Sequence, residues 1–572
     1  MKNLLFIAAA IFLLPFIGMK GSPAGSPSAS KPSSRAGNAA VGIAYAPHYI
    51  SPTPGRFPII ACSPISEGQI PTKADFDTVA ACGFNAAMTV FNTAHYFPLM
   101  KEIEDLGIVL IPILDYYTVT KAKDTIEYIR QYMSDNDIPY SMIGGYRVRD
   151  EPSYTEIYDG RIGERHNAIK NADPDVMPFV NLAAQPINDF SPNSLQKAYS
   201  SNPVLRVDMS KYFKECYYKV HPDVWSYDFY PFVYRSWKKK LFVEYEDFYY
   251  NLRLFAGMSR RTGMPFWAYC QATNIQNITI GETDNIYTEH PKAKEEYLRY
   301  EAFNALALGA KAITYWRYSY RDDAPHPDTV GTNYDHYISS LTDQNGRTTP
   351  EWKAVQKVNE EIRRHEKLFM NSRLQSYSLI GNPALLLDTG NYVKPTDSLC
   401  ADIPEYDGPV KVQVTSGPGV LVSKLQDGIR LVTFIVNQSP YDTTNVMLSY
   451  RRGDIRKVML EREHADSLGD TYSLGKLSED DDEIRLIGSD VEKVTDLKTG
   501  ADENLKYDPT NPADRIRYRE YRIKPAGYLI FEYEYVPGGE LYNDDQPDEP
   551  DMVAVRARES LATKETNNEY QL

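Results

Sequence analysis

From Phe57 to Phe369, short runs of β-branched and aromatic residues alternate with longer segments in which apolar residues recur three and four positions apart. The short runs are typical of buried strands, and the longer segments are typical of amphipathic helices. Eight strands are predicted in this way, at residues 57–63, 84–92, 107–115, 143–151, 177–184, 224–232, 264–272 and 312–319. With the helical segments between them and a closing helix at 350–369, they predict an α/β fold, a (β/α)8 TIM barrel of about 310 residues.

An open, doubly wound parallel sheet is the alternative way to arrange alternating strands and helices. Nucleotide-binding folds of that type carry a glycine-rich phosphate loop after the first strand. No such loop follows the strand predicted at 57–63. The closed barrel is therefore the favoured prediction.

The chain changes character after Asn371. At 572 residues it is too long for one ordinary domain, and two or three units are expected. Residues 372–536 alternate apolar and polar positions between turn signals, which predicts an all-β module, a β-sandwich. Residues 537–572 are polar, with an acidic patch and no periodicity, and are predicted to be disordered.

The N-terminal segment has the pattern of an export signal. Lys2 precedes an apolar run from Leu4 to Ile17, and Ser22 and Ala24 supply a small-x-small cleavage site. Residues 1–24 are therefore predicted to be a signal peptide, and 25–42, rich in Ser, Pro, Gly and Ala, a flexible linker. The barrel domain is expected at 43–371, in the periplasm or outside the cell.

Composition argues against two classes of partner. The net charge of −15 is unfavourable for binding nucleic acid, which requires a basic surface. The cysteines are scattered without a CxxC motif, and the histidines show no HxH or HxxxH spacing, so neither a metal nor another cofactor is predicted. The 44 tyrosines, 21 phenylalanines and 5 tryptophans include side chains whose flat apolar faces and polar edges suit sugars.

Polar residues gather at the ends of the predicted strands. In barrels of this kind the residues that bind and react project from the carboxyl ends of the strands. The residues at these positions are Asp115, Asp150, Glu151, Asn181, Asp228, Tyr230, Gln271, Trp316 and Arg317.

The alternation of side chains along a strand predicts which of them face the barrel axis. On the fourth strand the apolar side chains Tyr146 and Val148 should face the helices, together with Asp150, which turns Arg147, Arg149 and Glu151 inward. By the same reasoning, the inward residues of the sixth and seventh strands are Ser226, Asp228, Tyr230, Trp267, Tyr269 and Gln271.

Several carboxylates around one barrel mouth cannot all ionise at their ordinary pKa values. Their neighbours must raise some of these pKa values, or Arg149 and Arg317 must neutralise the charges. A carboxylic acid beside a carboxylate is what glycoside hydrolysis requires, with one group as proton donor and the other as nucleophile or base.

A barrel whose fourth strand ends in "DEPS", with aromatic residues on strands six to eight and a trailing β-sandwich, resembles a retaining-type glycoside hydrolase. It is similar to the β-galactosidase-like (clan A type) superfamily, which places its acid/base glutamate at the end of strand four. The resemblance spans residues 57–536 in architecture but only a few residues in motif. It implies that Glu151 is the acid/base and that Trp316 is a sugar platform.

The chain departs from this superfamily at two positions. The residue before the glutamate is usually Asn and here is Asp150, and strand seven usually ends in a nucleophilic Glu and here ends in Gln271. An amide cannot replace a carboxylate as nucleophile. Asp228, Glu282 and Asp115 are candidates for a second carboxylate that has moved, and Asp228 is favoured because strand ends hold geometry tightly.

The sequence thus predicts an exported glycoside hydrolase that acts on an oligo- or polysaccharide, with Glu151 and Asp228 catalytic. The alternative is a non-catalytic carbohydrate-binding protein with a degenerate barrel, which the absence of a carboxylate within about 10 Å of Glu151 would favour. The sugar, the linkage and the oligomeric state are not predicted. The residues predicted to bind substrate are Asp115, Asp150, Tyr230, Trp267, Gln271 and Trp316.

Overall fold

The computed structural model describes ten segments of the chain: residues 49–66, 69–184, 209–281, 285–321, 333–381, 403–427, 430–451, 455–457, 486–495 and 516–535. The predicted signal peptide, linker and C-terminal tail lie outside the described residues, and so does Glu282.

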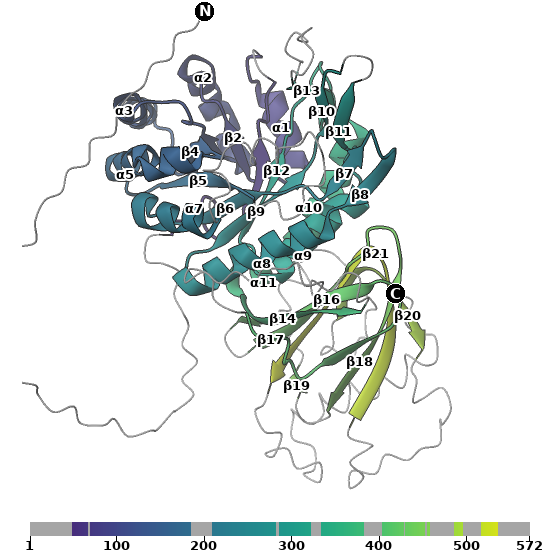
Figure 1. Cartoon of the computed structure of the whole chain (residues 1–572). Coiled ribbons are helices and arrows are strands. Elements are labelled where there is room, and N and C mark those ends of the chain that lie inside the picture. The colour runs from purple at the N-terminus through teal and green to yellow at the C-terminus, as the bar shows by residue number, and fades with distance from the viewer. Residues whose placement is uncertain are drawn as a thin grey trace, which may run out of the picture. The chain divides into compact units, whose positions relative to one another are not determined.

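Eight parallel strands form the central sheet in the order β3-β2-β1-β12-β9-β6-β5-β4 (Figure 1). Parallel bridges from Leu110 to Ile143 and from Ile113 to Arg147 join β3 to β4 and close the sheet into a barrel. The predicted (β/α)8 barrel is therefore confirmed. The barrel strands are β1 (Ile59–Cys62), β2 (Ala86–Thr89), β3 (Val109–Pro112), β4 (Gly145–Asp150), β5 (Met177–Ala183), β6 (Trp225–Asp228), β9 (Phe266–Gln271) and β12 (Ala312–Trp316).

Helices surround the barrel and cover the outer faces of its strands, so most strand residues are buried on both faces. Thr72 and Asp75 form a capping box at the start of the first helix, and Gly309, with φ 91°, lies two residues after the end of the helix at Glu295–Ala307. The helices are α1 (Lys73–Ala81), α2 (Thr93–Ile103), α3 (Val119–Asp135), α4 (Tyr154–Tyr158), α5 (Arg161–Ala172), α7 (Met209–Glu215), α8 (Tyr245–Thr262), α9 (Glu295–Ala307), α10 (Pro350–Arg364) and α11 (Glu366–Asn371). Three shorter turns are η1 (Glu104–Leu106), η2 (Tyr140–Met142) and η3 (Cys216–Val220).

A second, antiparallel sheet lies within segments that the sequence analysis treated as loops. It is built from insertions after barrel strands β6, β9 and β12, in the order β13-β10-β11-β7-β8. Its strands are only four to seven residues long, and three of them contain Asn, Gln or His, so they carry a weak strand signal. They are β7 (Phe232–Arg235), β8 (Lys240–Val243), β10 (Asn274–Thr279), β11 (Ile286–His290) and β13 (Asn333–Ser339).

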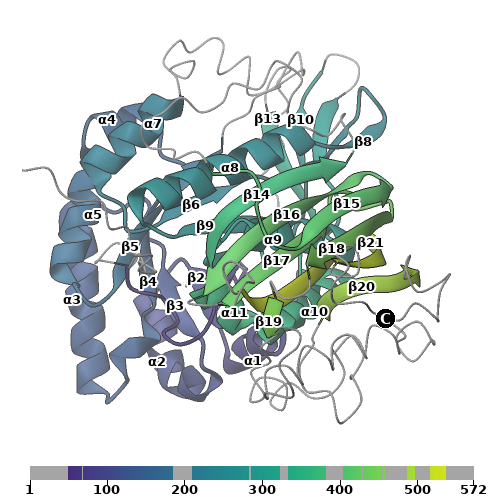
Figure 2. The same cartoon turned by 90° about the horizontal axis from the view of Figure 1, so that it is seen from below.

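The C-terminal region is all-β, as predicted (Figure 2). Its strands form one antiparallel sheet in which the long strand β21 pairs with β18 through its first half and with β17 through its second half. A separate apolar core, which includes Val422, Ile435 and Val446, fills this region. The strands are β14 (Arg373–Gly381), β15 (Lys411–Ser416), β16 (Gly419–Asp427), β17 (Arg430–Asn437), β18 (Thr444–Arg451), β19 (Ile455–Lys457), β20 (Leu486–Thr495) and β21 (Ile516–Tyr535).

Aromatic rings join the barrel to the C-terminal sheet. Phe303 of α9 stacks on Tyr528 of β21, with ring centroids 3.9 Å apart, and Phe369 of α11 stacks on Phe434 of β17 at 6.0 Å. All four side chains are buried. The contact buries apolar surface on both sides, so it stabilises the two regions together.

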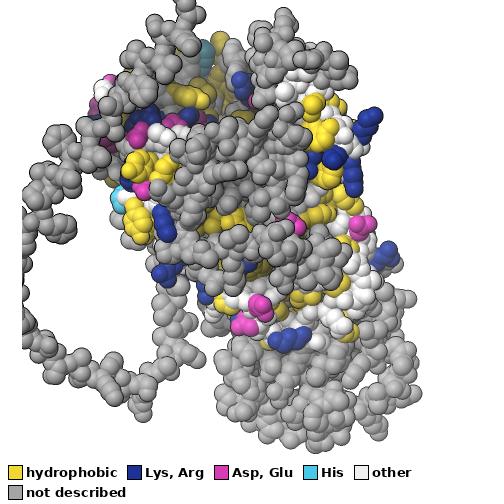
Figure 3. Space-filling view, viewed as in Figure 1, with side chains coloured by type: hydrophobic (Ala, Val, Ile, Leu, Met, Phe, Trp, Pro, Cys, Tyr) yellow, Lys and Arg dark blue, Asp and Glu magenta, His cyan; other side chains and the backbone are white. Residues whose placement is uncertain are grey.

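The surface of the described residues is mixed in character. Figure 3 shows hydrophobic, basic and acidic side chains side by side on the face presented. Within the described segments, no helix is both long enough and apolar enough to cross a membrane.

Candidate active site at the carboxyl end of the barrel

A bulge in β4 determines which residues of this strand reach the barrel mouth. The register with β5 pairs Arg147 with Phe179 and Arg149 with Val180, so Val148 is an extra residue between them. Arg147 is buried and ion-pairs with Asp115, whereas Arg149 turns away toward α4. The prediction that Arg149 faces inward and Asp150 outward is therefore wrong, because the bulge shifts the alternation by one residue.

Arg147 forms a buried two-point ion pair with Asp115. Its Nε and Nη2 atoms lie 3.1 and 2.7 Å from the two carboxylate oxygens, and both residues are 6% exposed. Burial raises the pKa of Asp115, and the charge of Arg147 acts in the opposite direction. Asp115 was predicted to bind substrate, but it does not line the cavity described below. The structure places it in a supporting position beneath that cavity's acidic residues.

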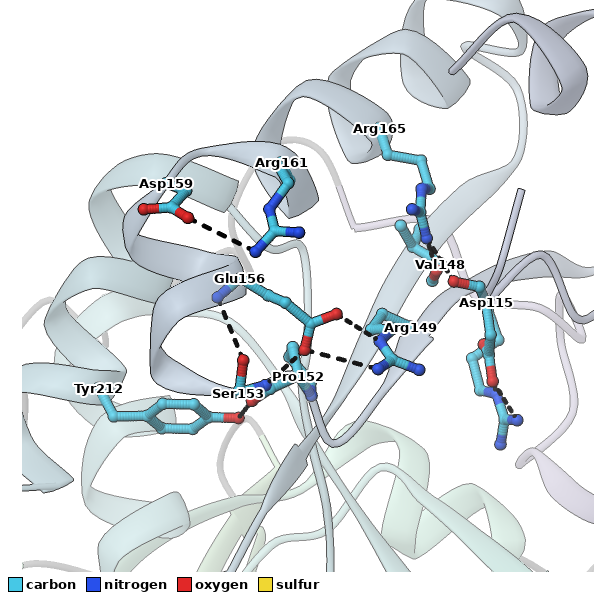
Figure 4. Close-up of polar contacts among 11 residues, drawn as sticks. Asp115, Val148, Arg149, Pro152, Ser153, Glu156, Asp159, Arg161, Arg165 and Tyr212 are labelled. Carbon is cyan, nitrogen blue, oxygen red and sulfur yellow. Dashed lines mark hydrogen bonds and ion pairs between the residues drawn. The ribbon is translucent and has the colours of Figure 1, made fainter. Parts of the chain in front are cut away.

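The loop after β4 is fixed by contacts that Figure 4 displays. Arg149 donates to Glu156 at 3.1 Å, and Ser153 and Glu156 form a capping box at the start of α4. Tyr212 of α7 donates to the main-chain oxygen of Pro152 at 2.9 Å. These contacts hold the residues on either side of Glu151, so its position is set by the packing of two helices.

A cavity of about 210 Å³ opens at the carboxyl end of the barrel. Six of the predicted site residues line it: Asp150, Glu151, Asp228, Tyr230, Gln271 and Trp316. Its other lining residues are Asn181, Tyr269, Thr273, Ile275, Asn277, His290, Asp335 and Tyr337. The structure thus brings together the ends of strands β4, β5, β6, β9 and β12, as the barrel prediction requires.

Glu151 presents its carboxyl group from an unusual backbone conformation. Its φ is 39°, a left-handed value that side chains other than Gly, Asn and Asp seldom adopt. Its N–H donates to the main-chain oxygen of Asn181 at 2.9 Å, which helps to hold this conformation. Such conformations cluster at functional sites, where surrounding structure enforces them.

The carboxyl groups of Glu151 and Asp228 lie close together, since both residues line the cavity and each acts on the ionisation of the other. Burial and the nearby charge of Asp150 raise the pKa of Glu151, although the residue as a whole remains open to solvent at the mouth. Burial and the charges of Glu151 and Asp150 raise the pKa of Asp228 well above its usual range. A pair of carboxyl groups in this arrangement retains one proton where isolated carboxyl groups would both be ionised.

Asn181 connects the acidic residues of β4 and β6. Its Nδ2 lies 3.0 Å from Oδ1 of Asp150 and 2.8 Å from Oδ1 of Asp228. Its own Oδ1 accepts the hydroxyl hydrogen bond of Ser226 at 2.8 Å. The sequence analysis placed Asn181 among the polar strand ends but assigned it no role.

Gln271 is held by the main chain. Its Nε2 donates to the oxygens of Thr273 and Pro291 at 2.8 and 3.0 Å. Its backbone N–H donates to Oε2 of Glu301, a buried residue of α9, at 2.7 Å. Two carbonyl oxygens facing one side-chain atom require a donor there. The local structure therefore selects an amide at the end of strand seven, where a carboxylate would meet two acceptors.

The aromatic residues divide between the cavity and the core beneath it. Tyr230 and Trp316 line the cavity and are partly exposed, so they are available to stack against a ring. Trp267 is fully buried and packs on Phe179, with ring centroids 5.0 Å apart. It was predicted to contact substrate. Its position on β9 instead places it in an inner layer of the barrel, four residues before Gln271.

The second sheet contributes residues that the sequence analysis did not anticipate. Asp335 lies on β13, where Asn277 of β10 donates to it at 2.6 Å. His290 ends β11 and packs edge-on against Tyr230, with ring centroids 5.7 Å apart. The spacing of apolar and polar residues in "NIQNIT" could have indicated the strand β10, but Asn and Gln are uncommon in strands.

Metal and thiol chemistry find no support in the described part of the chain. No group of three or more His, Cys, Asp or Glu residues there could hold a metal ion. Cys62, Cys82, Cys216 and Cys270 are buried and free.

No family model matches the chain, and no curated protein matches it. Solved structures do. A catalytic mutant of Gan42B, a GH42 β-galactosidase from G. stearothermophilus, is 9% identical over 86% of this chain and 100% of that chain, with a TM-score of 0.43. The endo-β-1,4-mannanase from Thermotoga petrophila is 12% identical over 70% of this chain and 96% of that chain, with a TM-score of 0.32.

The β-galactosidase from the Antarctic haloarchaeon Halorubrum lacusprofundi is 12% identical, with a TM-score of 0.32. The match covers 53% of this chain and 58% of that chain, which is less than two thirds of the relative's length. The fold of this chain is assigned from its own strand pairings, and the residues of the cavity are the basis for its proposed function.

Proposed function

We propose that this chain is a glycoside hydrolase whose reactive groups are Glu151 and Asp228. The observation that carries the proposal is the nearness of these two carboxyl groups in one cavity at the carboxyl end of a TIM barrel. Both pKa values are raised, so one group keeps a proton for donation while the other is a carboxylate. This is the combination that cleavage of a glycosidic bond requires.

In the proposed reaction Glu151 gives its proton to the glycosidic oxygen, which leaves as an alcohol. Asp228 acts as nucleophile or takes a proton from the attacking water, whose hydroxyl joins the anomeric carbon. Paired carboxyl groups are about 5–5.5 Å apart in retaining enzymes and about 6.5–9.5 Å apart in inverting ones. The separation of the Glu151 and Asp228 carboxyl groups around a bound sugar would therefore decide between the two outcomes.

The proposed substrate is a neutral oligo- or polysaccharide. Tyr230 and Trp316 offer aromatic faces to sugar rings. Among the described residues that line the cavity, Asp150, Glu151, Asp228 and Asp335 are acidic and none is Lys or Arg. A uronic acid or a sulfated sugar would meet like charge there. Export directed by residues 1–24 is part of the same proposal, since it would bring the enzyme to external glycans.

A carbohydrate-binding protein without activity is the second candidate. Gln271 favours it, because this amide stands where the resembling superfamily has its nucleophile. The nearness of Asp228 to Glu151 favours hydrolysis instead, since a second carboxyl group is within reach. The two candidates differ in whether a bound glycan is cleaved.

The test is an assay of the wild type on a panel of neutral aryl glycosides and β- and α-linked polysaccharides, with product release followed by chromatography. On any substrate that is cleaved, E151Q is expected to lower kcat by about 10²–10⁴-fold, since it removes the proton donor. E127Q is the matched control, because Glu127 is an exposed residue of α3 that does not line the cavity. Glycan binding without product release by the wild type would support the binding protein, and unchanged turnover by E151Q would exclude the proposed role of Glu151.

A further inference from the structure

The orientation of the Asn181 side chain is determined by its neighbours. Ser226 donates its hydroxyl hydrogen to Oδ1 of Asn181, while Nδ2 faces Asp150 and Asp228. The reverse orientation would direct the amide oxygen at two carboxyl groups. Asn181 is 1% exposed and Ser226 is fully buried, so solvent does not compete for these contacts. The amide is thus fixed as a donor to both acidic residues.

This arrangement opposes the two effects that discourage ionisation of Asp228. Burial and the charges of Glu151 and Asp150 raise its pKa, whereas the hydrogen bond from Asn181 lowers it. An amide is suited to this task because it donates without adding a charge or a further titration. Arg147 cannot replace it, since two of its nitrogens bind Asp115 and the third lies 3.3 Å from Asp150.

We propose that Asn181 is a positioning residue that holds Asp228 against Glu151 and keeps this pair ready to exchange a proton. It binds the side chains of Asp150 and Asp228 and, through its main-chain oxygen, the backbone of Glu151. One residue of β5 thereby sets the relative positions of three acidic residues from β4 and β6. The kinetic consequence of this inference rests on the proposed glycoside hydrolase function, but the effect on ionisation does not.

Other groups also act on the pair and must be kept constant in any test. They come from β4, from β1, from the segment after β3, from β9, from the segment after β6 and from the second sheet. The charged and titratable groups that line the cavity or act on its carboxyl groups are Cys62, Asp115, Arg147, Asp150, Tyr230, Tyr269, His290, Asp335 and Tyr337. A substitution at position 181 leaves all of these residues in place, and of their contacts it removes the hydrogen bond to Asp150.

The first experiment measures ionisation in the protein without substrate. Wild type and N181A are prepared with ¹³C-labelled aspartate and glutamate carboxyl groups, and infrared difference spectra are recorded from pH 3 to pH 9. The pair is identified as the signal lost in E151Q and D228N. In N181A its midpoint is expected to rise by about one pH unit, because the carboxylate loses a hydrogen bond to an uncharged donor. An unchanged midpoint would overturn the proposal.

Two further variants separate positioning from general stability. S226A keeps the amide but removes the hydroxyl that orients it, so the midpoint should rise by less than in N181A. N85A removes another buried amide, at the opposite end of the barrel, where it binds the main chain of Phe57 and Ile59. This control should lower the melting temperature without moving the midpoint. If N181A does not fold, the infrared titration of S226A becomes the test. An unchanged midpoint in S226A then counts against the proposal.

The second experiment uses a substrate that the wild type cleaves. In N181A the acid limb of the pH profile of kcat/KM should move upward by the same amount as the infrared midpoint. The kcat should fall about tenfold while KM changes little, since the amide acts on the reacting groups. Absence of turnover by the wild type would contradict the proposed function alone, and the infrared titration would still decide the role of Asn181.

Discussion

Arg147 and Asp115 form a two-point ion pair inside the barrel, with Nη2 of the arginine 2.7 Å from Oδ2 of the aspartate. Asp115 was predicted to bind substrate, and Arg147 was predicted to face the barrel axis. The pair instead lies between the apolar interior and the cavity, where Nη1 of Arg147 is 3.3 Å from Asp150. Asp115 thus compensates the charge of the arginine that supports the acidic side of the cavity.

Breaking this pair from one side is expected to be costly. D115N leaves the guanidinium of Arg147 buried with only part of its charge compensated, and the free energy of unfolding should fall by about 3 kcal/mol in urea denaturation. D159N is the matched control, because Asp159 pairs with Arg161 at 3.4 Å on the exposed surface. Its effect should be under about 1 kcal/mol. Equal stability of D115N and D159N would contradict a structural role for Asp115.

The carboxyl pair should reduce stability at neutral pH. The folded-state pKa values of Glu151 and Asp228 are raised, so the folded protein binds protons more tightly than the unfolded chain. The stabilisation that these groups provide is complete below their pKa values in the unfolded chain, about 4, and is lost as the pH rises through their pKa values in the folded protein. D228N should therefore raise the melting temperature at pH 7 and leave it nearly unchanged at pH 3.5. A lower melting temperature at pH 7 would contradict this reasoning.

His166 provides a second pH dependence, of opposite sign. It is fully buried on α5, and burial lowers its pKa to about 4. The unfolded chain binds the proton first as pH falls below about 6.5, so stability should decrease between pH 6.5 and pH 4, by about 3 kcal/mol in total. H166Q should flatten this part of the stability profile, measured by denaturant unfolding at each pH. H95Q, which changes a histidine on α2, should retain the slope of the wild type.

The barrel could be predicted because its strands are buried on both faces. Strands such as β1 and β2 are short apolar runs, and amphipathic helices such as α3 separate them. The candidate site followed from one topological rule, since parallel barrel strands bring their carboxyl ends to one face. Residues as distant in sequence as Glu151 and Trp316 were placed together in this way.

Three features could not be predicted from pattern alone. The bulge at Val148 depends on the register between two strands, which neither strand encodes by itself. The second sheet is made of short insertions whose pairing is long-range, as between β7 and β11. Trp267 and Gln271 share a strand and a face, but only the depth of each layer in the barrel decides which of them reaches the cavity.

Placing a carboxylate at the end of strand seven, where the resembling superfamily usually has one, should not improve activity. In Q271E the side chain would face the main-chain oxygens of Thr273 and Pro291, which now accept hydrogen bonds from the amide. Two lost hydrogen bonds and a carboxylate beside two acceptors should lower the free energy of unfolding at pH 7 by about 2–3 kcal/mol.

The loss in Q271E should shrink at pH 4, where a protonated glutamic acid can donate to one of the two oxygens. Q271M removes the amide without adding a charge, so its destabilisation should not depend on pH. Comparison with Q271E therefore separates the loss of the hydrogen bonds from the repulsion between the carboxylate and the two main-chain oxygens. Urea denaturation of both variants at pH 4 and pH 7 measures the difference. A stable Q271E with raised turnover would show that Gln271 replaced a catalytic carboxylate, and that the pairing of Glu151 with Asp228 is not the catalytic arrangement.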